Sequence, residues 1–462
     1  MKPHVFVLFV LLTIATGGAH AEREHRASSA VELAAVLKEA RPGDTIVLES
    51  GTWRDATIDL TRGGTAGAPI TIRAREPGRV MLTGASSLTF SAPYIVVDGL
   101  LFAQGALTKG SVVTFHSDHD RLTRSAIVDY NPPDAATPYY WVYFDGSDNR
   151  LDHSSFKGKS HQQPLVGNAI AGSRRNTTDH CAFTDIPYVA NRNGREIFRI
   201  WGYGGNEELG EDGAFFTIED NLFDHADGEG EEIISLKSNR NIVRRNTIRQ
   251  TRGGITNRSG NYNTIEQNSI LCEGYPGAYG MRVTGQHQRL VNNDIERCAY
   301  GIHLMAGEYI QESLTPSYQP IVRAGTPLGR VPAYNQPKHV LVAHNTLAGN
   351  QDADLLFGKG YKTGWPTAQR VLLPEENDIE YNLIRKANGG VAVDAPPRDT
   401  EPPLARFTFA ANHFAGNVVQ GGRIALTPVP AGFSTQPDAK AGVAVALHPL
   451  TARDVGAGWT PQ

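Results

Sequence analysis

The sequence predicts an all-β protein, a right-handed parallel β-helix (solenoid) with a short N-terminal capping helix. The first observation is a repeated phrase, apolar-x-x-Asn-x-apolar, as in IEDNLF, VRRNTI and IEQNSI. The second is its spacing, because Asn221, Asn246, Asn268 and Asn293 follow one another by 25, 22 and 25 residues. The third is the composition: 48 glycines and 27 prolines in 462 residues favour many turns and short strands over long helices.

A period in the low to mid twenties matches one coil of three short strands, and stacked coils bury an internal apolar row. An asparagine at one place in each coil has a structural explanation. It tolerates left-handed backbone, and its amide can bond to the amide of the next coil. Wider gaps later in the chain indicate inserted loops such as 311–337. The later copies of the phrase lie at Asn345, Asn382 and Asn412, and weaker early ones at Ser154 and Cys181.

The N-terminus predicts export and then the cap of the solenoid. Residues 1–21 combine Lys2, an apolar run and a small-x-small AHA sequence, which is typical of a secretory signal and short for a membrane span. We expect residues 22–462 to form a single β-helix domain, periplasmic or secreted, with no membrane partner. Ser29 and Glu32 fit a capping box that begins a short helix.

Charge and cysteines narrow the partners. The chain carries 44 basic and 48 acidic residues, a formal charge of −4, which argues against nucleic acid but allows a local basic groove. Cys181, Cys272 and Cys298 are widely spaced and include no CxxC pair. Buried thiols or one disulfide are therefore expected rather than a cysteine metal site.

The stretch EGEEIISLKS gathers three carboxylates, Glu229, Glu231 and Glu232, shortly before Lys237. Side chains alternate along a strand, so Lys237 and Ser235 share its outward face. A bulge would change the face that Glu232 uses. The cluster is either a solvated turn or a cation site beside a reactive lysine.

Three basic residues recur at nearly one coil length. Arg258 follows Lys237 by 21 residues, and Arg282 follows Arg258 by 24, with His287 nearby. Like charges stacked on neighbouring strands are unfavourable unless an anion lies among them. The spacing therefore predicts a binding site for a polyanion on one face of the solenoid.

Several separated motifs resemble polysaccharide lyase family 6, the family of alginate lyases and chondroitinase B. In order, they are GDTIVLESGTW, SFKGKSHQQPLVG, NGREIFRIWG, DGEGEEIISLKS, NRSGNYNTIEQNSI, GMRVTGQ and PLTARDVGAGW. The resemblance spans nearly the whole chain after the signal. It implies an enzyme, a carbon–oxygen lyase that acts on an acidic polysaccharide with calcium as cofactor.

By this resemblance, Lys237 corresponds to the Brønsted base and Arg258 to its acid partner. Arg282, His287 and Lys159 are candidate substrate contacts. Ser259 stands where some relatives have histidine.

The resemblance also implies calcium ligands, Asn193 in NGRE and Glu232. The family's Glu-x-Glu pattern would put Gly230 at the other acidic position. Either Glu229 or Glu231 takes that role, or neither does and the calcium site is weakened or absent.

The chemistry fits a uronate polymer. Its C5 proton is poorly acidic, and positive charge on the neighbouring carboxylate stabilises the enolate-like intermediate. A neutral lysine takes the proton and the C4 oxygen leaves with the help of a proton donor. We expect alginate as substrate. A chondroitin or dermatan sulfate lyase is the close alternative, and a β-helix hydrolase, epimerase or carbohydrate-binding protein is a further one.

Overall fold

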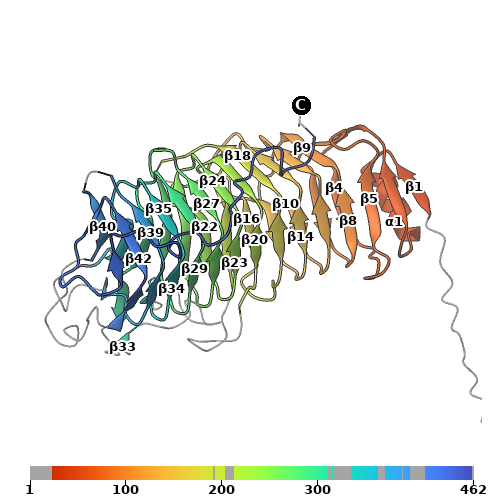
Figure 1. Ribbon diagram of the computed structural model, residues 1–462. Helices are drawn as coiled ribbons and strands as arrows, with labels where there is room; N and C mark the ends of the chain where they lie inside the picture. The colour runs from red at the N-terminus through yellow and green to blue at the C-terminus, as the bar shows by residue number, and fades with distance from the viewer. Residues whose placement is uncertain are drawn as a thin grey trace, which may run out of the picture.

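The computed structural model describes residues 23–190, 193–202, 213–310, 315–316, 334–362, 370–387, 389–395 and 411–459. In this part of the chain, three parallel sheets of 14, 13 and 14 strands run along the length of the molecule (Figure 1). Each coil supplies one strand to each sheet, and neighbouring strands within these three sheets pair in parallel. The predicted parallel β-helix is confirmed.

Sheets A and B contain 14 strands each. Sheet A consists of β1 (Glu24–Ala27), β2 (Thr45–Leu48), β5 (Ile70–Ala74), β8 (Ile95–Asp98), β11 (Arg121–Thr123), β14 (Arg150–Asp152), β17 (Thr177–Asp179), β20 (Thr217–Glu219), β23 (Ile242–Arg244), β26 (Thr264–Glu266), β29 (Arg289–Val291), β34 (Leu341–Ala343), β38 (Asp378–Glu380) and β41 (His413–Ala415). Sheet B consists of β3 (Gly51–Arg54), β6 (Val80–Gly84), β9 (Leu100–Gly105), β12 (Ala126–Val128), β15 (Ser155–Lys157), β18 (Ala182–Ile186), β21 (Leu222–Ala226), β24 (Thr247–Arg249), β27 (Ser269–Leu271), β30 (Asp294–Glu296), β35 (Thr346–Ala348), β39 (Leu383–Arg385), β42 (Asn417–Gln420) and β44 (Phe433–Ser434).

Sheet C carries the predicted basic residues. It consists of β4 (Thr57–Leu60), β7 (Ser87–Phe90), β10 (Ser111–Phe115), β13 (Tyr140–Phe144), β16 (Val166–Asn168), β19 (Phe198–Trp201), β22 (Glu232–Lys237), β25 (Gly253–Ser259), β28 (Ala278–Val283), β31 (Ile302–Met305), β36 (Leu355–Lys359), β40 (Val391–Asp394) and β43 (Arg423–Ile424). A small separate sheet joins β32 (Gly307–Ile310), β33 (Thr315–Pro316) and β37 (Arg370–Leu372).

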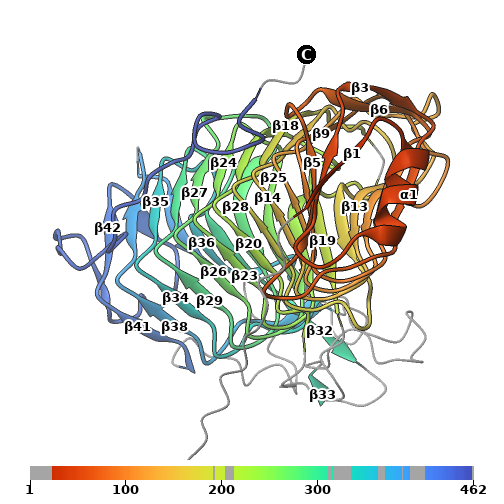
Figure 2. The same ribbon diagram turned by 90° about the vertical axis from the view of Figure 1, so that its right-hand side faces the viewer.

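The capping helix is confirmed as α1 (Ala30–Glu39), which packs against β1 and β4 at the first open end (Figure 2). Ser29 is its N-cap and accepts a hydrogen bond from the Glu32 amide at 3.2 Å. The Glu32 carboxylate accepts one from the Ser28 amide at 2.8 Å. Leu33 and Leu37 turn inward and are buried against the core. The predicted signal, residues 1–21, lies outside the described residues.

The core is one apolar column enclosed by the three sheets. Parallel register places like residues above one another, so Phe90, Phe115 and Phe144 on consecutive strands of sheet C stack at 4.7 Å between ring centroids. Each is fully buried. Burying a large apolar side chain of this kind contributes roughly 1.5–3 kcal/mol.

The repeated asparagines form a continuous ladder of side-chain amides. The Nδ2 of Asn221 donates to Oδ1 of Asn246 at 3.0 Å, and this bond recurs from coil to coil. The left-handed residue is the one before each asparagine, for example Asp220 at φ 55° and Arg245 at φ 54°, and not the asparagine itself. The ladder continues through Asn268, Asn293, Asn345, Asn382 and Asn417.

The predicted early copies of the repeat lie on the asparagine ladder, but one predicted late copy does not. Ser154 and Cys181 lie at the start of the ladder, since the Cys181 amide donates to Asn221 Oδ1 at 2.9 Å. The placement of Asn412 on this ladder is wrong, because its Oδ1 accepts from Asn377 in a second ladder. The shared phrase occurs at two corners of the coil, and the sequence pattern alone does not distinguish them.

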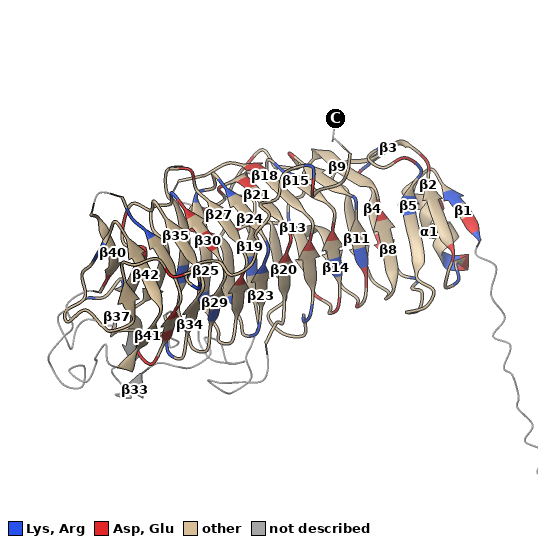
Figure 3. Cartoon of the chain, viewed as in Figure 1, with Lys and Arg blue, Asp and Glu red and all other residues tan. Residues whose placement is uncertain are grey.

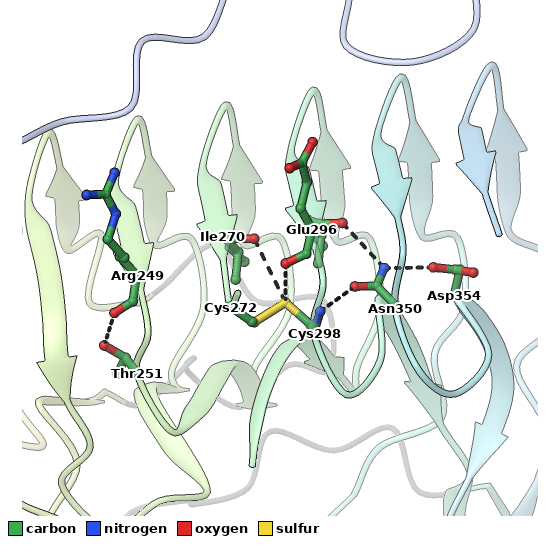
Figure 4. Close-up of a disulfide and its surroundings, with 9 residues drawn as sticks. Arg249, Thr251, Ile270, Cys272, Glu296, Cys298, Asn350 and Asp354 are labelled. Atoms are coloured by element: carbon green, nitrogen blue, oxygen red, sulfur yellow. Dashed lines mark hydrogen bonds between the residues drawn. A yellow bond between two sulfur atoms is a disulfide. The ribbon is translucent and has the colours of Figure 1, made fainter. Parts of the chain in front are cut away.

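Of the three cysteines, Cys272 and Cys298 form a disulfide between adjacent coils (Figure 4), and Cys181 is a buried thiol. No helix in the described part of the chain is long and apolar enough to cross a membrane.

Figure 3 shows both basic and acidic residues on strands of sheet A. Arg150 lies 2.6 Å from Asp179 on the next coil, and Arg244 lies 2.6 Å from Glu219 on the preceding coil. These pairs balance one another, so this face carries no concentrated positive charge.

The C-terminal segment, residues 440–459, runs back along the outside of the solenoid (Figure 1). The Leu450 amide donates to Thr247 Oγ1 at 2.7 Å, and the Ala457 amide donates to Ser155 Oγ at 3.0 Å. Trp459 reaches the N-terminal coils, where its indole nitrogen donates to the Arg124 carbonyl at 2.9 Å.

Candidate active site

A β-bulge in β22 turns an acidic residue toward the predicted lysine. Glu232 pairs with Gly254 and Ile234 with Ile255, so Ile233 is an extra residue in the strand. Ile233 and Ile234 are both buried in the core. The carboxylate of Glu232 therefore shares the side of Ser235, whose hydroxyl donates to it. The bulge considered from the sequence is present.

A second irregularity displaces the predicted arginine by one position. Leu236 pairs with Asn257 and Lys237 with Ser259, so Arg258 is the unpaired extra residue of β25. It nevertheless lines the same pocket as Lys237. The expected stacking of the two residues thus holds to within one residue of register.

One open pocket of about 690 Å³ brings the predicted cations and acids together. Among the predicted site residues, it is lined by Asn193, Glu229, Glu231, Glu232, Lys237, Arg258 and Arg282.

The three cations are held by fixed contacts. Nζ of Lys237 lies 3.3 Å from Oε1 of Glu196 and 5.1 Å from the ring centroid of Trp201. Nε of Arg258 lies 3.7 Å from Glu232, and Arg282 hydrogen-bonds the same carboxylate. Two arginines thus converge on one acid beside the lysine.

Three buried or half-buried acids meet at the inner wall of the pocket. Carboxylate oxygens of Glu196, Glu229 and Glu232 all lie within 4.8 Å of one another. Glu229 also accepts hydrogen bonds from the amides of Gly194 at 2.7 Å and Arg195 at 3.3 Å. Burial and the neighbouring Glu196 carboxylate raise the pKa of Glu229 to about 7. The repulsion behind this shift would be relieved by a cation.

This acid cluster fits a hard divalent cation. Oε2 of Glu196 is buried and accepts no hydrogen bond in the described structure, since its nearest cation, Arg199 Nε, is 3.6 Å away. A bare buried carboxylate oxygen is costly, and oxygen-only ligand sets are those that Ca²⁺ prefers.

Glu231 stands apart from the cluster. Its side chain is 68% exposed, and its carboxylate lies 3.7 Å from Arg282 at the pocket surface. Of the two acids left open by the sequence, Glu229 joins the cluster and Glu231 does not.

Two predicted substrate contacts lie outside the pocket lining. Lys159 is 3% exposed, and its Nζ donates to the carbonyls of His161 at 2.8 Å and Gln163 at 2.6 Å. His287 is stacked between Tyr262 at 4.7 Å and His339 at 4.8 Å. Both side chains therefore make their contacts within the protein and do not face the pocket.

Sequence reasoning missed four residues. Glu196 is the last residue of the quoted NGRE, and Trp201 pairs with Lys237 across the sheet, so both were within reach of the motif. Tyr334, stacked 4.0 Å from Arg258, lies near the end of the insertion 311–337 and gave no periodic signal. Tyr188 lines the pocket from a loop after β18 and gave none either.

The fold and the pocket define a parallel β-helix protein with a pocket lined by basic residues beside a cluster of three acidic residues. A family model described as chondroitinase B matches residues 27–388, and the chain belongs to this family, polysaccharide lyase family 6. The solved structure of a PL6 family polysaccharide lyase from Pseudopedobacter saltans is 46% identical, with a TM-score of 0.85, over 94% of this chain and 99% of that one.

The structure of the PL6 family alginate lyase AlyGC is 26% identical, with a TM-score of 0.77. The similarity covers 95% of this chain and 59% of AlyGC. None of the curated proteins compared with the chain matches it.

Proposed function

We propose that the protein is an exported lyase that cleaves alginate by β-elimination. The observation that carries this proposal is the pocket in which Lys237 and Arg258 project from adjacent strands beside a cluster of buried acids. The similarity of the chain to the alginate lyase AlyGC, over 95% of its length, supports the choice of alginate as substrate.

The roles follow from the contacts. Lys237 is the base. After giving up its ammonium proton, it takes the C5 proton of the uronate, a double bond forms between C4 and C5, and the bond from C4 to the glycosidic oxygen breaks. Arg258 donates a proton to that oxygen or stabilises its charge, and no water is consumed. Arg282 faces the pocket from the next strand and contacts the uronate carboxylate.

Calcium is the proposed cofactor. Glu196, Glu229 and Glu232 would hold it, and Asn193, next to the amide that fixes Glu229, is a candidate fourth ligand. When bound, the ion supplies positive charge that neutralises the uronate carboxylate and lowers the barrier to proton removal. Glu196 links this site to the base, because its other oxygen faces Lys237.

A chondroitin or dermatan sulfate lyase is the second candidate, favoured by the description of the matching family model as chondroitinase B. The same lysine, arginine and cation cluster would serve that substrate.

The test uses the purified chain 22–462 with alginate, its poly-mannuronate and poly-guluronate blocks, and dermatan sulfate. Ultraviolet-absorbing unsaturated products from alginate or its blocks support the first candidate, and products from dermatan sulfate alone support the second. No product from any polymer, with or without calcium, would exclude both. Recovery of the chain outside the cytoplasm, beginning at residue 22, tests the proposed export.

A further inference from the structure

The outward side of sheet C continues beyond the pocket with one more cation, Lys359. β31 and β36 follow β28 in the sheet, and Lys359 ends β36, opposite Met305 across a bulge. The side chain is half-buried. It does not line the pocket that holds Lys237 and Arg258.

Stacked aromatic rings connect this lysine with the pocket. Nζ of Lys359 lies 4.1 Å from the ring centroid of Tyr300, which stacks on Tyr279 at 4.6 Å and on His303 at 3.8 Å. Tyr279 and Tyr300 are 4% and 7% exposed, so they form a firm base for the residues above them. A cation over a buried ring is held in one place and keeps its donors available.

Lys359 differs from the other described lysines that are not exposed, because carbonyls bind the ammonium of Lys159 and carboxylates pair with the remaining three. Lys237 pairs with Glu196, Lys338 with Glu375 at 3.4 Å, and Lys386 with Asp354 at 3.5 Å. No described carboxylate forms an ion pair with Lys359. Asp352 and Glu231 attract the Lys359 ammonium, but neither forms an ion pair with it. A partly desolvated ammonium without a directly contacting anion is costly, and an anionic ligand would offset that cost.

The separation from the pocket identifies which part of a ligand would reach it. Strands lie about 4.8 Å apart, so Lys359 is roughly 10 Å from Arg282 and roughly 19 Å from Lys237 along the sheet. Lys237, Arg258 and Arg282 project from three successive strands. A polymer that contacts them in turn therefore runs across the strands toward β36.

We propose that Lys359 binds a carboxylate of an acidic polysaccharide several sugars away from the cleaved bond. This contact makes the enzyme favour long chains over short oligosaccharides. It rests on the proposed function to the extent that the ligand is a polyanion lying along sheet C.

The test replaces Lys359 by methionine, which keeps the apolar stem on Tyr300 and removes the charge. The kcat/KM for alginate polymer, divided by that for an alginate trisaccharide, should fall about 10-fold, mainly through KM. Lys359→Arg should restore most of the ratio. The control is Lys440→Met, which makes the same charge change on the exposed C-terminal segment and should leave the ratio unaltered.

An unchanged ratio in Lys359→Met, or an equal fall in Lys440→Met, would overturn the proposal. Thermal unfolding of each variant identifies a folding defect. If it appears in Lys359→Met, the test rests on Lys359→Gln.

Binding separates this inference from the lyase activity itself. Electrophoresis through gels containing alginate or dermatan sulfate measures polymer binding in the Lys237→Ala background. Lys359→Met should weaken retardation several-fold relative to that background. If no polymer is cleaved by the wild-type chain but retardation still depends on Lys359, the lyase proposal fails and this inference stands. Retardation that does not depend on Lys359 overturns it.

Discussion

Glu229 is expected to destabilise the calcium-free protein and to stabilise the calcium-bound one. Burial and the Glu196 carboxylate raise its pKa from 4.5 to about 7. The folded state therefore holds this proton more tightly than the unfolded state. The stabilisation is complete below pH 4.5 and is lost as the pH rises through 7. At pH 8.5 the ionised group costs about 3 kcal/mol of unfolding free energy, at 1.36 kcal/mol per pH unit.

Glu229→Gln removes the charge and keeps an oxygen that can accept from the Gly194 amide. In urea unfolding at pH 8.5 with a chelator, the variant should be more stable than the wild type by up to about 3 kcal/mol. Added calcium should stabilise the wild type and have little effect on the variant, because a ligand that binds only the folded state adds to its stability. The order of stability thus reverses with calcium.

The matched control is Glu231→Gln, the same charge change two residues away on an exposed side chain. It should change stability by less than about 0.5 kcal/mol and leave the calcium response intact. A Glu229→Gln protein that is less stable than the wild type in chelator would refute the reasoning. So would a calcium response lost in Glu231→Gln but kept in Glu229→Gln.

Three further outcomes are expected. Lys237→Ala should lower turnover at least about 100-fold with unchanged circular dichroism, as for loss of a general base; turnover near the wild-type rate would remove Lys237 from that role. Asn246→Ala should cost about 2–5 kcal/mol in urea unfolding, because Asn221 loses the acceptor for its buried amides; a cost under 1 kcal/mol would contradict the ladder's importance. Burial lowers the pKa of His161 and of His303 to about 3. As the pH falls, these histidines therefore bind protons in the unfolded state before they do so in the folded state. Their contribution to the free energy of unfolding is complete above pH 6.5 and is lost as the pH falls toward 3. By pH 5 each should cost about 2 kcal/mol, and a urea midpoint equal at pH 7 and pH 5 would be inconsistent with this.

The coil period was accessible from sequence because each coil repeats the same local choices, an inward apolar pair and a corner asparagine. That period predicted the solenoid and brought Lys237, Arg258 and Arg282 to one face. It did not predict the extra residue at Ile233 or the unpaired position of Arg258, since bulges depend on how two neighbouring coils pack.

The remaining differences between prediction and structure arise where tertiary packing determines the position of a side chain. Lysine is usually found at the protein surface, yet the ammonium of Lys159 is buried and donates hydrogen bonds to two backbone carbonyls. The motif NGRE contains Glu196, but the sequence does not indicate a function for it, because only the fold shows that it lies beside both Glu229 and Lys237. Neither placement follows from spacing.

The returning C-terminal segment changes how such a molecule comes apart. A stack of coils bound only to their neighbours can lose its ends one coil at a time. Here hydrogen bonds join residues 302 and 335 positions apart in sequence, so Ala457 and Trp459 are attached to the coils that contain Ser155 and Arg124. These contacts link coils that are not neighbours in the stack, which makes unfolding more nearly all-or-none than pairing between neighbouring coils alone would. Contacts of such long range also form late in folding. Residues 440–459 thus couple coils that are not neighbours in the stack.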